Sequence, residues 1–227
     1  MPRTLNPEAH AVRRDAFLDA AQRLIQSKGY EQMSVQDVLD ELETSKGAFY
    51  HYFDSKGALL DAVVERMVAT SIAALEPIAF DATVPAIDRI RAMFASIASL
   101  KADQKDFLLE LLRVWMSDDN AVVRERFRRS VTERMTPLMA RTVREGTAAG
   151  TFTATSPADA AHVVVSLILG ANAAATELYM ANELGAVGFE EARRMLTAYA
   201  EAFERILGAP PGSLPLVDDA VLHEWYG

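Results

Sequence analysis

Residues 44–56, TSKGAFYHYFDSK, combine aromatic rings with groups that donate hydrogen bonds. Lys46 supplies an ammonium group, Tyr50 a phenol hydroxyl and His51 an imidazole, all within one short segment. Such groups hydrogen-bond to an opposing surface and need no metal or cofactor to do so. The segment therefore has the chemistry of a binding surface.

A helical wheel divides this segment into two faces. At about 100° per residue, Tyr52 and Phe53 fall within about 60° of Phe49 and form an aromatic inner face. The outer face carries polar, small and donor groups: Lys46, Gly47, Tyr50 and His51. An interior glycine costs a helix about 1 kcal/mol relative to alanine. Its presence predicts that the backbone of this helix approaches another surface closely.

The elements that position this segment are helical, because no stretch alternates with period two for long enough to predict a sheet. We expect an all-α protein. A first helix over 8–28 stops at Gly29, and Ser34 caps a second helix from Val35. Further helices are expected at 55–75, 85–100, 103–117, 120–149, 157–182 and 189–207. Residues 208–227 begin as a Pro/Gly linker and are expected to end in a short helix.

Two prolines bear on these helix limits. Pro77 is expected to follow the end of the helix over 55–75. Pro137 lies inside a periodic segment, where it removes a backbone hydrogen bond, so we expect it to kink or split that helix.

Catalytic constellations are absent from the sequence. The chain has no cysteine, and its histidines at 10, 51, 162 and 223 lack the spacing of metal ligands. It also lacks a phosphate-binding glycine loop and a GxSxG turn. The sequence therefore predicts a protein that is not an enzyme and that has no metal site and no cofactor.

Composition and charge bear on the partners and the cellular location of the protein. The 227 residues carry a formal net charge of −9, which argues against a surface that coats nucleic acid or anionic membrane. The absence of cysteine suits a reducing cytoplasm, and the N-terminal residues lack the apolar core of a secretory signal. The apolar stretch 160–175 is shorter than the ~20 residues of a membrane span. We therefore expect a buried helix there, a cytoplasmic protein and no membrane partner.

Residues 11–60, with SVQDVLDELETSKGAFYHYFDSKGALL at the centre, resemble the DNA-binding head of the tetracycline repressor (TetR) family of transcriptional regulators. The pattern S-K-G-x-x-Y-x-x-F followed by x-S-K-x-x-L carries the resemblance. It implies a helix-turn-helix whose recognition helix, 45–51, lies in the major groove of double-stranded DNA. The residues that it implies as DNA contacts are Thr44, Ser45, Lys46, Gly47, Tyr50, His51 and Lys56. Ser34, at a helix N-terminus, adds a phosphate site through its hydroxyl and backbone amides.

One position departs from the family pattern, and some contacts have simpler interpretations. The family usually has glycine where this chain has Glu43, so either the turn takes another backbone conformation or a carboxylate lies close to DNA. Ser34 is alternatively only a helix cap, and Lys56 only a solvated charge. Positive potential from the N-terminal segment would come from Arg3, Arg13 and Arg14.

The resemblance implies a DNA-binding domain over 1–56 and a ligand-binding and dimerisation domain over 57–227. A homodimer is expected through 157–207, because the run VVVSLILGANAAA must be covered on two sides; the alternative is a central core helix of a monomer. Large adaptable side chains indicate a pocket for a small molecule, although such residues are also ordinary core. The six ligand-binding residues predicted are Met67, Phe94, Trp115, Met116, Met135 and Met139.

Together these features predict a ligand-responsive regulator of transcription. We expect a repressor that leaves its DNA operator when a small, largely apolar effector binds. The alternative is a ligand-binding or interaction protein of the same fold that no longer reads DNA.

Overall fold

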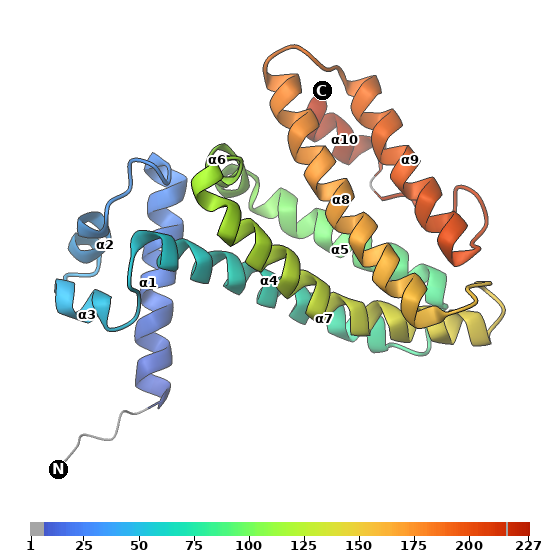
Figure 1. Ribbon diagram of the computed structural model, residues 1–227, viewed down its shortest axis with the longest axis horizontal. Coiled ribbons are helices and arrows are strands. Elements are labelled where there is room, and N and C mark those ends of the chain that lie inside the picture. The colour runs from blue at the N-terminus through green and yellow to red at the C-terminus, as the bar shows by residue number, and fades with distance from the viewer. Residues whose placement is uncertain (1–6, 217) are drawn as a thin grey trace. The chain divides into compact units, whose positions relative to one another are not determined.

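The computed structural model describes residues 7–216 and 218–227, and these form helices joined by turns, with no strand among them. The all-α prediction is therefore confirmed. The chain packs as two compact units, which are described separately: residues up to 69 with 104–127, and residues 70–103 with 128–227 (Figure 1). Helices α4 and α7 each contribute to both units.

The first unit contains the short helices predicted for the head. Its elements are α1 (Pro7–Lys28), α2 (Val35–Glu41), α3 (Lys46–Tyr50), the first part of α4 (Lys56–Phe80), α6 (Lys105–Trp115), a 3-10 turn (Asp118–Asn120) and the start of α7 (Ala121–Ala148). Helix α1 ends at Gly29, which has φ +81° and donates its N–H to the Ile25 carbonyl oxygen at 2.9 Å. The predicted glycine stop is thus present.

The core of the first unit draws on residues far along the chain. Rings from the head, such as Phe17 and Phe49, share one buried cluster with Phe107 and Leu111 of α6. Residues of α4 and α6 thus complete the core on which α1, α2 and α3 pack. The packing unit therefore extends beyond residue 56, whereas the functional division at that residue remains a prediction.

The second unit is built on longer helices. It contains the rest of α4 and α7, α5 (Ala86–Asp103), α8 (Pro157–Glu183), α9 (Phe189–Leu207) and α10 (Asp219–Tyr226). Helices α8 and α9 lie side by side, and α10 packs on both of them (Figure 1). The Tyr226 hydroxyl of α10 donates a hydrogen bond to the Ala175 carbonyl oxygen at 2.9 Å. The linker followed by a short C-terminal helix agrees with the sequence prediction.

Two proline predictions need correction. Helix α4 passes through Pro77 and ends at Phe80, beyond the predicted limit near residue 75. Buried Arg89 donates to the Ala79 carbonyl oxygen at 2.8 Å and pairs with Glu145 at 2.7 Å, which satisfies a backbone acceptor at the end of α4. Helix α7 also continues through Pro137, so this proline does not split the helix, and the alternative of a kink remains a prediction.

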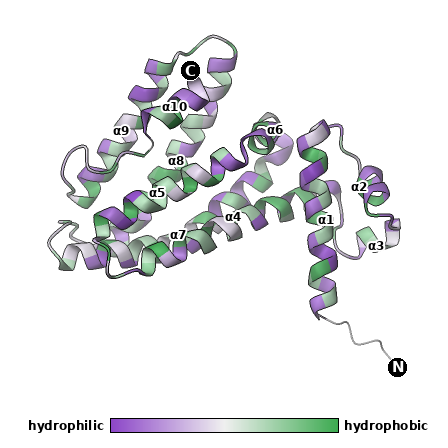
Figure 2. Ribbon diagram, turned by 180° about the vertical axis from the view of Figure 1, so that it is seen from behind, coloured by the Kyte–Doolittle hydropathy of each residue, from purple (hydrophilic) through white to green (hydrophobic). Residues whose placement is uncertain are grey.

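Helix α8 is less covered than the sequence predicts. Hydrophobic residues run along it, and by length and composition it is one helix that could cross a membrane (Figure 2). Only 22% of its most apolar 18 residues are buried within the chain. Within one chain this stretch is therefore buried less completely than expected, because the second unit covers only part of its circumference.

Candidate nucleic-acid interface

Helix α3 is held in place by its aromatic face. Phe49 is fully buried, and its ring centroid lies 5.8 Å from that of Phe17 and 5.7 Å from that of Phe53. Tyr52 is half-buried on the same side, 5.5 Å from Phe17. A helix of five residues has little stability of its own, so these ring contacts fix its orientation. The core assignment made from the helical wheel is confirmed for Phe49 and Phe53.

The opposite side of α3 is open to solvent. Ser45, Lys46, Gly47, Tyr50 and His51 are all exposed, and Tyr50 retains 55% of its surface. A Cβ atom added at Gly47 would lie 3.9 Å from the Ser45 hydroxyl, the nearest atom. The fold therefore leaves room for alanine at Gly47, and nothing inside the first unit requires glycine there.

Local caps set where α2 and α3 begin. Ser45 accepts a hydrogen bond from the Ala48 N–H at 3.3 Å and so caps α3. At α2, the Ser34 backbone N–H and hydroxyl both donate to the Asp37 carboxylate at 2.6 Å, and the hydroxyl accepts from the Asp37 N–H. Lys28 pairs with the same carboxylate at 2.6 Å. The hydrogen bond from Lys28, followed by those from Ser34, holds the pKa of Asp37 well below its usual range.

Ser34 is thus a cap with both of its donors engaged by Asp37. A phosphate at this helix start would have to share those donors with a carboxylate, which repels it. The interpretation of Ser34 as a cap is supported by direct contacts, and its role as a DNA contact remains a prediction.

The turn between α2 and α3 resolves one of the two alternatives at Glu43. Glu43 has φ +46°, the left-handed region that glycine adopts at little cost, and no other non-glycine residue among those described has positive φ. The Thr44 N–H donates to the Leu39 carbonyl oxygen at 2.9 Å and closes the turn. The turn therefore keeps a glycine-like conformation with an exposed carboxylate beside α3.

Lys56 is drawn toward its own unit rather than freely solvated. Its Nζ donates to the Glu31 carbonyl oxygen at 3.2 Å and lies 4.2 Å from the centre of the Tyr30 ring. Burial lowers the pKa of Lys56, while Glu31 and Asp37 act in the opposite direction. Two of its three donor hydrogens remain for a phosphate.

Sequence reasoning missed His10, which lies beside the end of α3. Its ring centroid is 4.6 Å from Tyr52 and 5.6 Å from His51, so α1 contributes a second imidazole to this surface. No local pattern signals this contact, because it joins positions about forty residues apart. Two further residues of α1, Arg13 and Arg14, stack near Phe17 and Phe53, whereas Arg3 lies outside the described residues.

The residues predicted to bind a ligand fall in both packing units. Met67, Trp115 and Met116 belong to the first unit, where Trp115 packs edge-on against Phe127 and Met116 is 48% exposed. Phe94, Met135 and Met139 belong to the second unit, and all three are buried. Buried side chains of this kind serve as core whether or not a ligand binds, so the ligand-binding set remains a prediction.

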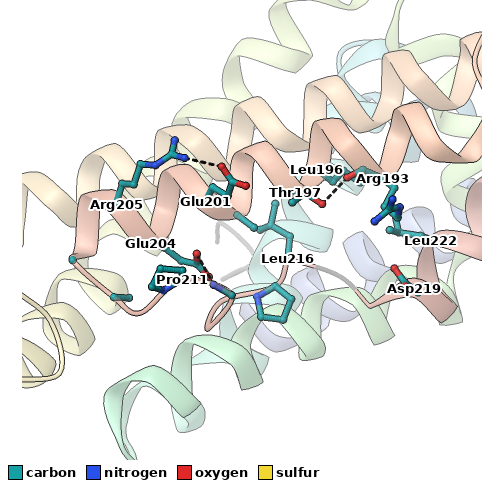
Figure 3. A pocket seen from close by; sticks show the side chains of 15 residues that line it. Arg193, Leu196, Thr197, Glu201, Glu204, Arg205, Pro211, Leu216, Asp219 and Leu222 are labelled. Atoms are coloured by element: carbon teal, nitrogen blue, oxygen red, sulfur yellow. Dashed lines mark hydrogen bonds and ion pairs between the residues drawn. The ribbon is translucent and has the colours of Figure 1, made fainter.

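A hollow of about 660 Å³ lies elsewhere in the second unit, between α9 and the segment that leads into α10 (Figure 3). None of the six predicted residues lines it. Among its charged groups, Arg205 pairs with Glu201 within α9, and buried Glu204 accepts from the N–H groups of Gly212 and Leu214. The two hydrogen bonds to Glu204 hold the C-terminal segment on α9.

The small residues of α8 serve packing within the chain. A Cβ atom at Gly170 would lie 3.3 Å from the Tyr199 hydroxyl of α9, and Ala171 is buried. Other apolar residues of the two helices remain exposed: Val163 at 42% and Met195 at 45%. Close approach at Gly170 therefore belongs to the α8–α9 contact, and the surface left for a partner includes larger side chains.

The fold and the exposed face of α3 define an all-helical protein with an N-terminal helix-turn-helix. Residues 17–63 match the family described as "Bacterial regulatory proteins, tetR family". The resemblance stated from the sequence is thus confirmed over these residues.

Relatives in sequence are similar to this chain over that region. An uncharacterized HTH-type transcriptional regulator of Lactococcus lactis subsp. lactis is 46% identical over 55 residues, which are 24% of this chain and 28% of that protein. The HTH-type transcriptional repressor DhaR of Mycobacterium sp. (strain GP1) is 29% identical over 84 residues, 37% of this chain and 42% of DhaR. The chain spans less than half the length of either relative. Both are described as regulators of transcription, which agrees with the expectation that this protein is not an enzyme.

Solved structures extend the likeness over the whole fold. The SmeT–triclosan complex matches with a TM-score of 0.60 at 21% identity, over 92% of this chain and 97% of that one. The reduced form of E. coli NemR matches with a TM-score of 0.51 at 24% identity, over 88% and 99%. At these identities the likeness establishes the fold.

Proposed function

We propose that the protein is a cytoplasmic transcriptional regulator that binds an operator in double-stranded DNA. It acts as a repressor and leaves the operator when a small, largely apolar effector binds. The observation that carries the proposal is the exposed face of α3. Buried rings anchor this short helix to its unit, and its other side exposes Lys46, Gly47, Tyr50 and His51 to solvent. A major groove admits such a helix and its donors.

A homodimer through residues 157–207 is part of this proposal. The apolar stretch of α8 is mostly unburied within one chain, and the exposed Val163 and Met195 extend that surface over α8 and α9. A second copy would cover these residues. Two heads on one duplex would then contact half-sites about 34–36 Å apart, or a multiple of that spacing.

DNA binding is tested by selecting duplexes from a random pool with the full-length protein and measuring affinity in gel shifts over a range of salt. We expect a selected site with two-fold symmetry and an affinity that falls steeply with salt, because phosphate contacts release counterions. Lys46→Ala should weaken binding to all sequences and reduce the salt slope by about 1. His51→Ala should also weaken binding.

A second candidate is a ligand-binding protein of this fold that no longer reads DNA. The observation that favours it is Glu43, an exposed carboxylate in the turn immediately before α3. If no duplex binds at low salt, this second function replaces the first.

Release by an effector requires that the effector bind the non-DNA conformation more tightly. A tenfold preference supplies only about 1.4 kcal/mol of coupling, so effective release needs a larger difference. We propose α4 as the lever, since it begins at Lys56 and passes through both packing units. Met67→Trp should then change release by an effector while leaving operator affinity unchanged; unchanged release would count against α4.

A further inference from the structure

The second unit contains a lysine that has no acidic partner. Lys101, near the end of α5, donates from Nζ to the Asn172 side-chain oxygen of α8 at 2.5 Å. An ammonium group cannot accept a hydrogen bond, so the amide must turn its oxygen toward Lys101 and its NH2 group away. The contact joins positions 71 residues apart and fixes the orientation of both side chains.

The charge of Lys101 is not compensated within the described chain. Asn172 is neutral, and no carboxylate of the described residues pairs with this lysine. Burial lowers the pKa of Lys101 to about 8. Lys28, by contrast, pairs directly with Asp37. A cation in this setting costs folding energy unless a ligand supplies the missing negative charge.

The hydrogen-bonding groups of Lys101 and Asn172 indicate what kind of ligand would complement them. Lys101 has three donor hydrogens and uses one, and the Asn172 NH2 group has two donors with no partner among the described residues. Both side chains are half-buried rather than sealed. The pair therefore presents about four unused donors, one positive charge and no unused charged acceptor, which fits a monoanionic oxygen group.

On the N-terminal side of each residue, the positions one helical turn away are apolar. One helical turn from Lys101 lie Ile97 and Ala98, and one turn from Asn172 lie Ile168 and Leu169. All four are half-buried. A ligand at the pair thus meets hydrocarbon on both helices, and a single charge favours a carboxylate over a doubly charged phosphate ester.

We propose that Lys101 and Asn172 bind the carboxylate of a small, otherwise apolar acid, and that such an acid is the effector. The second half of this statement rests on the proposed function. The statement that Lys101 and Asn172 bind a carboxylate concerns ligand binding alone, and it does not depend on whether the protein binds DNA.

Binding is tested by titration calorimetry of the full-length protein with four probes: decanoate and 2-naphthoate, each against its neutral primary amide. We expect at least one acid to bind, and its amide to bind at least about tenfold more weakly, as loss of a charge-assisted hydrogen bond requires. Lys101→Met should reduce binding of the acid by about tenfold or more, and Asn172→Leu should also weaken it. Lys101→Arg should retain part of it. An amide that binds as well as its acid overturns the proposal.

Two controls separate a ligand site from a structural contact. Lys105→Met removes the same charge from a half-buried lysine of the first unit and should leave acid binding unchanged. Lys101→Met should raise the melting temperature of the ligand-free protein, because it removes a partly desolvated cation that has no acidic partner among the described residues. If Lys101→Met instead lowers the melting temperature and binds the acid like the wild type, Lys101 is structural.

The pH dependence gives a further readout. Lys101 is charged below its pKa and loses its proton as the pH rises through it, so acid affinity should fall as the pH rises from about 7 to about 9.5. A bound carboxylate raises the pKa of Lys101, so binding near pH 8.5 should take up protons. Lys101→Arg, which stays charged, should abolish both effects. An affinity independent of pH in the wild type would contradict the proposal.

Gel shifts with the selected duplex then separate the two proposals. Release by the acid in the wild type but not in Lys101→Met supports both. Acid binding without any DNA binding supports the site and removes the regulator. DNA release by a neutral apolar compound, with no acid bound, keeps the regulator and overturns the site.

Discussion

Helices α3 and α8 differ in which of their faces is buried within the chain. In α3, buried rings such as Phe49 occupy the inner side, and the polar side faces solvent. In α8, most of an apolar stretch remains unburied although the helix lies against α9 and α10. A five-residue helix needs its unit to hold it, whereas a 27-residue apolar helix needs more cover than its unit provides. An exposed polar face and an exposed apolar face fit different partners, which is why we propose a charged polymer for α3 and a second hydrophobic surface for α8.

The largest effect is expected from a variant that removes the aromatic anchor of α3. Phe49→Ala removes a fully buried ring and should lower the free energy of unfolding by about 3–5 kcal/mol, measured by urea unfolding. Tyr50→Ala is the matched control, because it removes a ring from the exposed side and should change stability by about 0.5 kcal/mol or less. Equal losses for the two variants would contradict the two-sided description of α3.

The next-largest effect is expected from charges placed on the exposed apolar side of α8 and α9. The double variant Val163→Glu with Met195→Glu should convert a dimer to a monomer, because each charge would be buried without a partner. Operator affinity should then fall by about a hundredfold or more, as the second head no longer adds its effective concentration. Analytical ultracentrifugation and gel shifts measure the two results.

Val122→Glu provides the control for that experiment. Val122 is 61% exposed and lies in the first unit, at the start of α7, so it should leave the dimer intact. A monomeric wild type, or a double variant that remains dimeric, would show that α8 and α9 are covered in another way.

A smaller effect concerns the turn that aims α3. Glu43→Gly relieves a left-handed conformation and should raise the free energy of unfolding by about 1 kcal/mol. It also removes a carboxylate near the DNA surface, so operator affinity should rise. Glu43→Gln removes the charge while keeping the strain, and therefore should raise affinity without raising stability.

The smallest effect separates stability from recognition at Gly47. Gly47→Ala should stabilise the protein by up to about 1 kcal/mol, since the added methyl group meets open space, and should weaken operator binding. Gly57→Ala, a similar change in α4 with its nearest atom at 3.7 Å, should leave operator binding unchanged. An unchanged operator affinity in Gly47→Ala would mean that the backbone of α3 does not approach DNA closely.

The sequence predicted the limits of helices correctly where those limits depend on nearby residues. The caps at Ser34 and Ser45 and the stop at Gly29 depend on atoms within a few residues, and all three are found in the structure. The limit near Pro77 was wrong: α4 continues to Phe80, and Arg89, from the next helix, donates to the Ala79 carbonyl oxygen at its end. The ligand-binding residues were chosen by side-chain type alone, and type does not distinguish a pocket from a core.

By itself, the sequence determined the helical class, the order of the helices and the two faces of α3, because capping and periodicity act over one or two turns. Only the tertiary structure decided that α6 completes the core of the head, that His10 lies beside Tyr52, and that Lys101 meets Asn172. Those contacts join residues tens of positions apart. Their energies depend on how the helices pack, and no local pattern in the chain records that packing.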